Sequence, residues 1–343
     1  MNWKAQGPVH SEFATRPSPF LADCHLHFEG SLPPEALRAL ARRAGHRFAE
    51  EAAFADARAA VKDAADFLAL YAEVCRIFRG PEDYAEASRA LVQALAADGV
   101  AYAEIYVSPE IFGRFQLDRR ACLEAIDEGF RAEGREAGIT CRILLDAVRH
   151  WGPESAHRVL GLYESAPLSS VVGFGLGGDE AALPAAAFAE VYERARALGL
   201  KTSVHVGEWT GPESVREALD VLKPDRIDHG IAAVRDEPLL ERLADEGTVL
   251  YVAPTGNLAT GAVRRWDEHP LPRLCEAGVR VALGADDPLL FDTMTSGEYA
   301  VARERFGFDE ATLGLLAEHA WRGAFCSTEE RQEGLGRMGI TVT

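Results

Sequence analysis

The chain has 343 residues and a formal net charge of −18, from 36 basic and 54 acidic side chains. A hydrophobic fraction of 48% and a charged fraction of 26% are typical of a globular protein with a large core. The acidic balance excludes a basic nucleic-acid-binding surface and disfavours an anionic membrane as a partner, so a small-molecule ligand is expected.

The N-terminus and the cysteines bear on where the protein works. Residues 1–20 form a tail with polar or proline residues every few positions and without the apolar stretch of a signal peptide. No run of about 18 apolar residues occurs, so no membrane span is predicted. The six cysteines are scattered without a C-x-x-C pair, which favours reduced thiols in a cytoplasmic protein. The sequence leaves the oligomeric state open.

Short apolar stretches alternate with helical stretches along nearly the whole chain. Those expected to be β-strands are residues 21–26, 100–107, 141–148, 170–176, 202–206, 226–229, 248–252 and 279–283. Helical periodicity is clear between them, as in 183–198, 213–221 and 237–244. Because helical crossovers join parallel strands, eight such units predict an α/β fold of the (β/α)8 TIM-barrel type.

The interval between the first two strands is much longer than the others. Residues 33–98 contain several helical stretches, which we expect to form an insertion near the barrel mouth. A separate helical domain is disfavoured because no Pro/Gly/Ser-rich linker bounds the segment. Residues 322–343 are expected to form a closing helix and a tail. Residues 1–343 are therefore predicted to form a single barrel domain.

Ionisable residues gather where the predicted strands end, which is the edge where barrel enzymes place their chemistry. They are His25 and His27 in the first strand, His205 and Glu208 at the fifth, His229 at the sixth, and Asp286 and Asp287 after the eighth. Each motif has a structural alternative, since an Asp-Asp-Pro sequence also suits a helix N-cap and a lone histidine is often a hydrogen-bonded core residue. Their joint occurrence on four strands favours a single site.

Three imidazoles and one carboxylate match the ligand preferences of a divalent transition metal, most often zinc. The proposed ligands are His25, His27, His205 and Asp286. Zinc lowers the pKa of bound water towards about 7, which provides a nucleophile at neutral pH. His229 is placed to orient that water, Glu208 to donate a proton to the substrate, and Asp287 to contact the substrate.

Two other zinc chemistries fit less well. Cytidine-type deaminases need an H-x-E motif with P-C-x-x-C, and the chain has no such pair. Binuclear barrel hydrolases usually bridge two metals with a modified lysine at a strand end, and none of the four lysines lies at one. One zinc ion per chain is therefore expected.

At this point the sequence resembles the adenosine deaminase family of the amidohydrolase group. The matching segments, in family order, are HLHFEGSL (25–32), VSPE (107–110), VVGFGLGGDE (171–180), HVGE (205–208), RIDHG (226–230), PTGNLATGAV (254–263) and DDPLLF (286–291). The ordered set covers most of the chain. The resemblance implies the same zinc ligands, Glu208 as the proton donor to purine N1, and His229 as the residue that orients the attacking water.

The resemblance also implies how the substrate is bound. Gly178 would contact the purine ring through its backbone and Asp287 would contact N7. Phe67 and Leu68, with Tyr71, resemble the hydrophobic gate helix over the family's pocket, although an amphipathic core face would look the same. Glu29 stands where adenosine-specific members tend to have aspartate for the ribose 5′ end, which suggests that the substrate is a free base or a nucleoside changed at the 5′ position.

The expected reaction is hydrolysis of the 6-amino group of an adenine nucleoside to a 6-oxopurine and ammonia. Adenosine and a 5′-modified adenosine, such as 6-aminodeoxyfutalosine of menaquinone biosynthesis, rank nearly equal, and free adenine ranks third. Trp209, where a small residue is usual, is one of several departures near the pocket. Two rivals are a non-catalytic binding protein and an amidohydrolase that cleaves a ring amide. The complete set of ligands and acid–base residues disfavours the first, and the purine-binding set disfavours the second.

Overall fold

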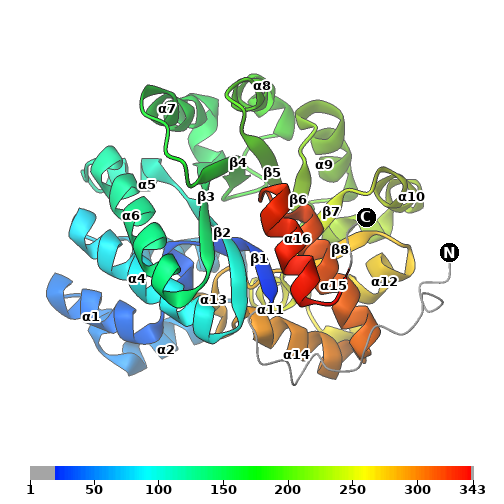
Figure 1. Cartoon of the computed structure of the whole chain (residues 1–343), viewed down its shortest axis with the longest axis horizontal. Helices are drawn as coiled ribbons and strands as arrows, with labels where there is room; N and C mark the ends of the chain where they lie inside the picture. Colours follow the sequence, from blue (N-terminus) through cyan, green and yellow to red (C-terminus); the bar gives the residue numbers. More distant parts are fainter. Residues whose placement is uncertain (1–19, 341–343) are drawn as a thin grey trace.

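The structure is a computed structural model that describes residues 20–340, so the predicted tail lies outside the described residues except for Phe20. Eight strands form one sheet in which each strand pairs in parallel with the next along the chain. Helices surround these strands (Figure 1). The strands are β1 (Leu21–His27), β2 (Val100–Val107), β3 (Thr140–Val148), β4 (Val171–Gly177), β5 (Lys201–Val206), β6 (Arg226–His229), β7 (Val249–Val252) and β8 (Arg280–Leu283).

The barrel closes between β1 and the segment that follows β8. The backbone N–H of His27 donates to the carbonyl of Asp286 at 2.9 Å, and the N–H of Asp286 donates to the carbonyl of His25 at 2.8 Å. Leu26 and Asp286 form the corresponding parallel bridge. The predicted (β/α)8 barrel is confirmed, and its seam is made by residues expected to bind the metal.

The helices follow the strands as the periodicity predicts, with short extra helices at several loops. They are α1 (Pro34–Ala44), α2 (Glu51–Ala59), α3 (Ala64–Cys75), α4 (Pro81–Ala97), α5 (Pro109–Arg114), α6 (Arg119–Ala137), α7 (Gly152–Ser165), α8 (Ala189–Ala197), α9 (Pro212–Glu217), α10 (Glu237–Glu246), α11 (Pro254–Ala259), α12 (Leu271–Glu276), α13 (Pro288–Phe291), α14 (Thr295–Phe306), α15 (Glu310–Gly323) and α16 (Thr328–Arg337). Within residues 20–340, no helix is long and apolar enough to cross a membrane.

The long interval after β1 contains two kinds of helix. α4 packs along α6 and against β2, which is the position of an ordinary outer helix of the barrel. α3 instead packs against the short helix that follows β1, and its side chains reach the pocket. The part of residues 33–98 that lies at the mouth is therefore α3, while α4 completes the helical ring.

The end of the barrel away from the pocket is held by a buried ion pair. Arg226 of β6 and Glu104 of β2 are fully buried, and Arg226 Nη1 lies 2.5 Å from Glu104 Oε2. The same guanidinium donates to the carbonyls of Cys24 at 2.8 Å and Gly323 at 3.2 Å, so it joins β1, β2, β6 and the end of α15.

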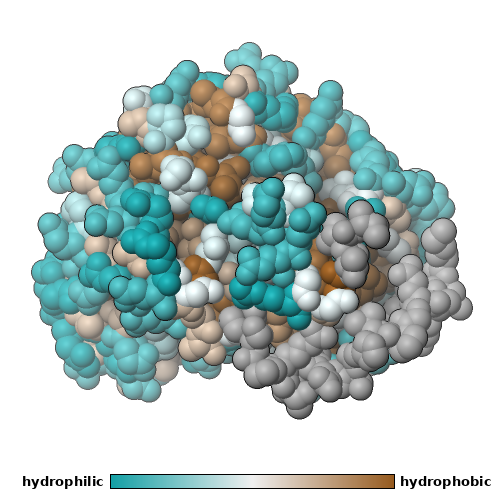
Figure 2. All heavy atoms as spheres, viewed as in Figure 1, coloured by the Kyte–Doolittle hydropathy of each residue, from teal (hydrophilic) through white to brown (hydrophobic). Residues whose placement is uncertain are grey.

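α16 follows α15 in the closing segment, and the side chains on its outer surface are mostly hydrophilic (Figure 2).

Candidate active site

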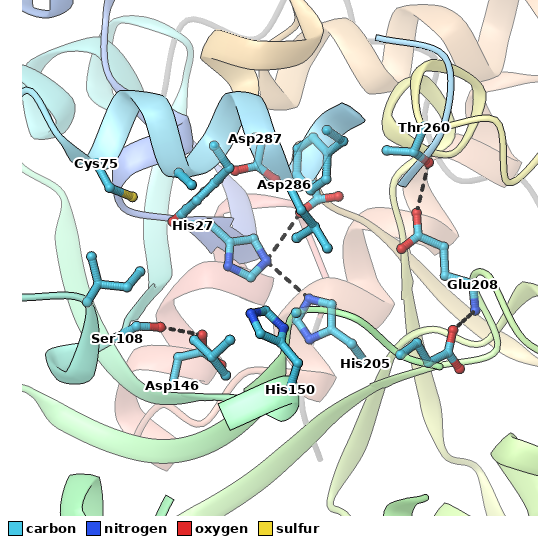
Figure 3. A pocket seen from close by; sticks show the side chains of 18 of the residues that line it. His27, Cys75, Ser108, Asp146, His150, His205, Glu208, Thr260, Asp286 and Asp287 are labelled. Atoms are coloured by element: carbon cyan, nitrogen blue, oxygen red, sulfur yellow. Dashed lines mark hydrogen bonds and ion pairs between the residues drawn. The ribbon is translucent and has the colours of Figure 1, made fainter. Parts of the chain in front are cut away.

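The candidate site is a pocket whose wall includes residues at the carboxyl ends of several barrel strands. Polar side chains, among them His27, His205 and Asp286, lie close together in it (Figure 3). α3 lines the pocket with Phe67, Leu68 and Tyr71. Carboxyl-end loops from several strands meet only when the barrel is closed, which explains how residues far apart in sequence share one cavity.

Four predicted ligand atoms converge at the base of the pocket. His205 Nε2 lies 3.0 Å from His25 Nε2 and 3.1 Å from His27 Nε2. Asp286 Oδ1 lies 3.4 Å from His25 Nε2 and 3.3 Å from His27 Nε2. The structure thus brings together the complete predicted ligand set from β1, β5 and the segment after β8.

The separations fit a bound zinc ion. Donor atoms at 2.0–2.1 Å from one zinc ion in tetrahedral geometry lie roughly 3.3 Å apart, which is close to the observed spacing. His205 Nε2 faces two other ring nitrogens at about the same distance, and a single proton on it could serve only one of them. A cation that accepts a lone pair from each of the three Nε2 atoms removes this conflict. The second ring nitrogen of His25 lies 3.3 Å from the carbonyl of Tyr251, which suits the tautomer with a free Nε2 lone pair.

His229 lies beside this cluster with a strained backbone. Its φ of 62° is in the left-handed region, as is the φ of 60° at Asp286. Such a backbone conformation costs about 1–3 kcal/mol for each residue, and it persists only where the surrounding structure holds it. His229 Nε2 lies 3.4 Å from Glu208 Oε2 and 3.9 Å from Asp286 Oδ2. His229 also comes within 4.8 Å of the ligand atoms of His25, His205 and Asp286. His27 Nε2 lies nearer to the Asp286 carboxylate, at 3.3 Å, than His229 Nε2 does at 3.9 Å, which favours His27 as the ligand and His229 as the neighbouring group.

Glu208 is buried in a setting that favours the protonated form of its carboxyl group. Burial, with the nearby charges of Asp286 and Glu180, raises its pKa well above the ordinary value. Asn257 Nδ2 donates to Glu208 Oε1 at 3.0 Å, and Thr260 Oγ1 donates to it at 3.3 Å. These contacts fix one oxygen and leave the carboxyl group able to act as an acid in the pocket.

Asp287 is a second buried acid, next to a predicted ligand but directed differently. Its Oδ1 has no hydrogen-bond partner among residues 20–340, and burial with the charge of Asp286 raises its pKa well above the ordinary value. Asp287 precedes α13, yet its side chain makes no capping hydrogen bond. A Cβ on Gly30 would lie 1.6 Å from Asp287 Oδ1, so the glycine after Glu29 is needed for this side chain to fit.

Three of the four remaining predicted substrate-binding residues line the pocket. Gly178, at φ 88°, lines the pocket, and a Cβ there would approach Val148 Cγ1 to 3.0 Å. Phe67 and Leu68 line the pocket from α3, and the Phe67 ring stacks on Phe291 at 5.3 Å between centroids. Gly178, Phe67 and Leu68 thus line the pocket, where the sequence predicted substrate-binding residues.

Glu29 lies elsewhere. It is buried and absent from the pocket wall, and its carboxylate accepts hydrogen bonds from the hydroxyls of Tyr71 at 2.9 Å and Tyr84 at 3.3 Å. Burial raises its pKa to about 7. The predicted contact between Glu29 and a ribose 5′ end stays a prediction, and it would require these two hydrogen bonds to be replaced.

Sequence reasoning assigned no role to Asn257 and Glu180, which follow β7 and β4. Asn257 is fully buried, and besides binding Glu208 its Nδ2 lies 3.1 Å from His229 Nδ1. Glu180 is buried beneath the loop after β5. Both belong to segments that carry the family resemblance, PTGNLATGAV and VVGFGLGGDE. The sequence signal that could have found them was a polar residue shortly after a strand end.

The model of the family described as "Adenosine deaminase" matches residues 20–338. An adenine deaminase of Chelativorans sp. is 37% identical over 322 residues, which cover 94% of this chain and 98% of that protein. An adenine deaminase of Rhizobium leguminosarum bv. trifolii is 39% identical over 319 residues, with coverage of 92% and 98%.

Solved structures agree with this likeness. The crystal structure of adenine deaminase from Arthrobacter aurescens superposes with a TM-score of 0.88 at 28% identity, covering 94% of this chain and 98% of that one. An amidohydrolase from Burkhoderia ambifaria with bound zinc superposes with a TM-score of 0.87 at 25% identity, with coverage of 98% and 94%.

Proposed function

This chain belongs to the adenosine deaminase family, whose members are zinc-dependent hydrolases of C–N bonds, and we propose that its substrate is free adenine. The coarser activity is hydrolytic deamination of an adenine-type compound. In the proposed reaction, water adds its oxygen to ring carbon C6, and ammonia leaves to give hypoxanthine.

The donor set assigns roles at the base of the pocket. We propose His25, His27, His205 and Asp286 as the groups that hold one zinc ion per chain. When bound, zinc supplies Lewis acidity, which lowers the pKa of a water in its coordination sphere towards about 7. His229 stays neutral because burial lowers its pKa to about 3, so its ring can hydrogen-bond to the attacking water and orient it.

The two buried acids can serve the two edges of a purine that carry N1 and N7. Glu208, whose pKa burial raises well above its ordinary value, can donate its proton to N1 and so make C6 more electrophilic. Asp287, whose pKa is also raised well above its ordinary value, can donate a hydrogen bond to N7 through Oδ1, which has no partner among residues 20–340. Gly178 brings its backbone against the ring edge because it carries no side chain. General acid catalysis of this kind contributes typically about 10²–10⁴-fold in rate.

The choice of free adenine rests on Glu29. The tyrosine hydroxyls of α3 and α4 already occupy its carboxylate, which lies outside the pocket wall and is therefore not presented to a ribose hydroxyl. Relatives named adenine deaminase, at 36–39% identity, support the same choice. The sequence alone ranked this substrate third, behind adenosine and a 5′-modified adenosine.

A second candidate is an adenine nucleoside. The family model that matches residues 20–338 is described as "Adenosine deaminase", which favours a nucleoside as the alternative substrate. Adenosine, a 5′-modified adenosine such as 6-aminodeoxyfutalosine, and adenine therefore all enter the test.

The test is an ultraviolet deamination screen with the zinc-loaded enzyme. The compounds are adenine, adenosine, 2′-deoxyadenosine, 5′-methylthioadenosine and 6-aminodeoxyfutalosine, each compared by kcat/KM. We expect adenine to give the highest value. A higher value for any nucleoside would overturn the proposed substrate while leaving the deaminase chemistry in place.

Cellular setting and domain organisation follow from other features. All six cysteines are unpaired in the structure, as expected of a reducing compartment, and we propose a cytoplasmic enzyme. A diffusible purine suits the acidic chain better than a polyanion does. Buried apolar side chains from β1 to α16 belong to one core, which supports the proposal of a single barrel domain.

A further inference from the structure

Glu180 follows β4 and reaches across to the loop after β5, which carries the proposed proton donor. It is 5% exposed and lines the pocket (Figure 3 shows the region around Glu208). Its Oε2 accepts hydrogen bonds from the backbone N–H groups of Glu208 at 3.1 Å, Trp209 at 2.8 Å and Thr210 at 3.2 Å. Its Oε1 accepts from the N–H of Gly207 and from the Thr210 hydroxyl.

This arrangement satisfies the backbone of a loop that has little regular structure of its own. Residues 207–210 lie between β5 and α9, where no strand or helix partner takes their N–H groups. Buried backbone donors must be paired, and one carboxylate here takes four consecutive ones. Gly207, at φ 68°, provides the turn that points these groups the same way. The loop conformation therefore depends on Glu180.

The opposite side of the loop carries the chemistry. The Glu208 carboxyl group is held by Asn257 and Thr260, which approach it from α11 and the residue after it. Glu180 fixes the backbone of Glu208 while these two fix its side-chain oxygen. The negative charge of Glu180 is also among the causes that raise the pKa of Glu208.

We propose that Glu180 is a positioning residue for deamination, which holds the backbone of residues 207–210 so that the Glu208 carboxyl group meets the substrate ring. This inference rests on the proposed function, in which Glu208 is the proton donor. Glu180 acts through Glu208 and touches no reacting atom. A displacement of about 1 Å at a reacting group can cost roughly 10²-fold in rate, so the effect on turnover is expected to be large.

The first experiment compares Glu180→Ala, Glu180→Gln and a matched control, each loaded with zinc. We expect Glu180→Ala to lower kcat about 10²-fold per bound zinc, with KM within about 3-fold of the unmodified enzyme. Glu180→Gln keeps an accepting oxygen, so its loss should be smaller, roughly 10-fold. The control is Glu217→Gln, because Glu217 accepts a single backbone hydrogen bond, from Ala185 at 2.8 Å, and we expect unchanged kinetics.

The second experiment tests whether Glu180 acts through Glu208. In a double-mutant cycle, Glu180→Gln should cause almost no further loss in a Glu208→Gln background, because groups that act as a unit are not additive. Amide hydrogen exchange at residues 207–210 should be faster in Glu180→Gln, which is a readout that does not depend on activity.

The outcomes separate the two proposals. Unchanged kcat and unchanged exchange in Glu180→Gln would overturn the role of Glu180, as would fully multiplicative losses in the cycle. A Glu208→Gln enzyme with nearly unmodified activity would overturn the proposed proton donor instead. If Glu180→Ala does not fold, Glu180→Gln and its exchange rates decide the question.

Discussion

At the scale of residues, neighbouring carboxyl groups in one pocket are driven to different protonation states. Burial opposes ionisation of Asp286, but His25 and His27 outweigh it and hold its pKa well below the ordinary value. Glu208 and Asp287, buried without a cation of their own, have raised pKa values. Titratable groups pushed apart in this way identify which act as acids and which stay charged.

Glu208→Gln should abolish proton donation while keeping the shape of the side chain. We expect kcat to fall about 10²–10⁴-fold, because a neutral amide cannot transfer a proton to a ring nitrogen. Zinc content, measured by metal analysis, should stay at one equivalent per chain, since Glu208 is not among the proposed ligands. A variant that keeps most of its activity would rule out Glu208 as the proton donor.

The raised pKa of Glu208 predicts the alkaline side of the pH profile. The acid must be protonated, so kcat/KM should be level below the pKa of Glu208 and fall as pH rises through it. Because that pKa is raised well above the ordinary value, the decline should begin at a correspondingly higher pH. The measurement is kcat/KM against pH for the zinc-loaded enzyme, and a decline that begins near the ordinary pKa of a glutamate, about 4.3, would contradict the assignment.

At the scale of elements, loops from successive strands make the site, and α3 closes it. The seam between β1 and the residues after β8 brings His25, His27 and Asp286 together through backbone hydrogen bonds. α3 supplies the aromatic wall, with Phe67 against Phe291 and, at 6.3 Å between centroids, Trp209. Trp209 Nε1 donates to Thr260 Oγ1 at 3.3 Å, which connects this wall to the residue that holds Glu208.

Phe67→Ala should weaken substrate binding more than the chemical step. Removing an aromatic wall worth about 1.5–3 kcal/mol of burial should raise KM roughly 10- to 100-fold, with a smaller change in kcat. The matched control is Phe54→Ala, because Phe54 of α2 has the same exposure of 8% as Phe67. Phe54 packs against Phe48 and does not line the pocket. Equal effects of the two substitutions on KM would show that α3 is a structural helix only.

At the scale of the whole molecule, the two ends of the barrel do different work. The carboxyl-end loops hold strained backbone, unpartnered polar atoms and shifted pKa values. The other end is tied by the buried pair of Arg226 and Glu104, whose hydrogen bonds reach four segments of the chain. Chemistry at the carboxyl end and stabilising contacts at the amino end are the usual division of a barrel enzyme.

Breaking the buried pair should destabilise the protein without touching the pocket. Arg226→Met leaves Glu104 as an uncompensated buried charge and should lower the free energy of unfolding by about 3–5 kcal/mol. Arg226→Met combined with Glu104→Gln should recover part of that loss. Chemical denaturation monitored by circular dichroism gives the values, and a single substitution that costs well under 1 kcal/mol would contradict this role.

The sequence by itself determined the strands, the barrel and the identity of the metal and acid–base candidates. Apolar stretches bounded by turn residues predicted the eight strands almost to the residue, as at 100–107 and 226–229, because local pattern controls strand formation. His25 and His27 could be placed on one face because side chains alternate along a strand. The seven polar candidates were found because they lie in or directly after predicted strands, at the edge where barrel enzymes place their chemistry.

The tertiary structure decided what those side chains touch. Glu29, next to the histidine motif, turned out to face two tyrosines of α3 and α4, and no local pattern records that contact. Glu180 and Asn257 gained their partners only when the barrel brought together the loops that follow β4, β5 and β7. Hydrogen bonds between residues tens of positions apart depend on how the barrel closes, and the closed barrel, rather than any segment, sets the protonation of its buried acids.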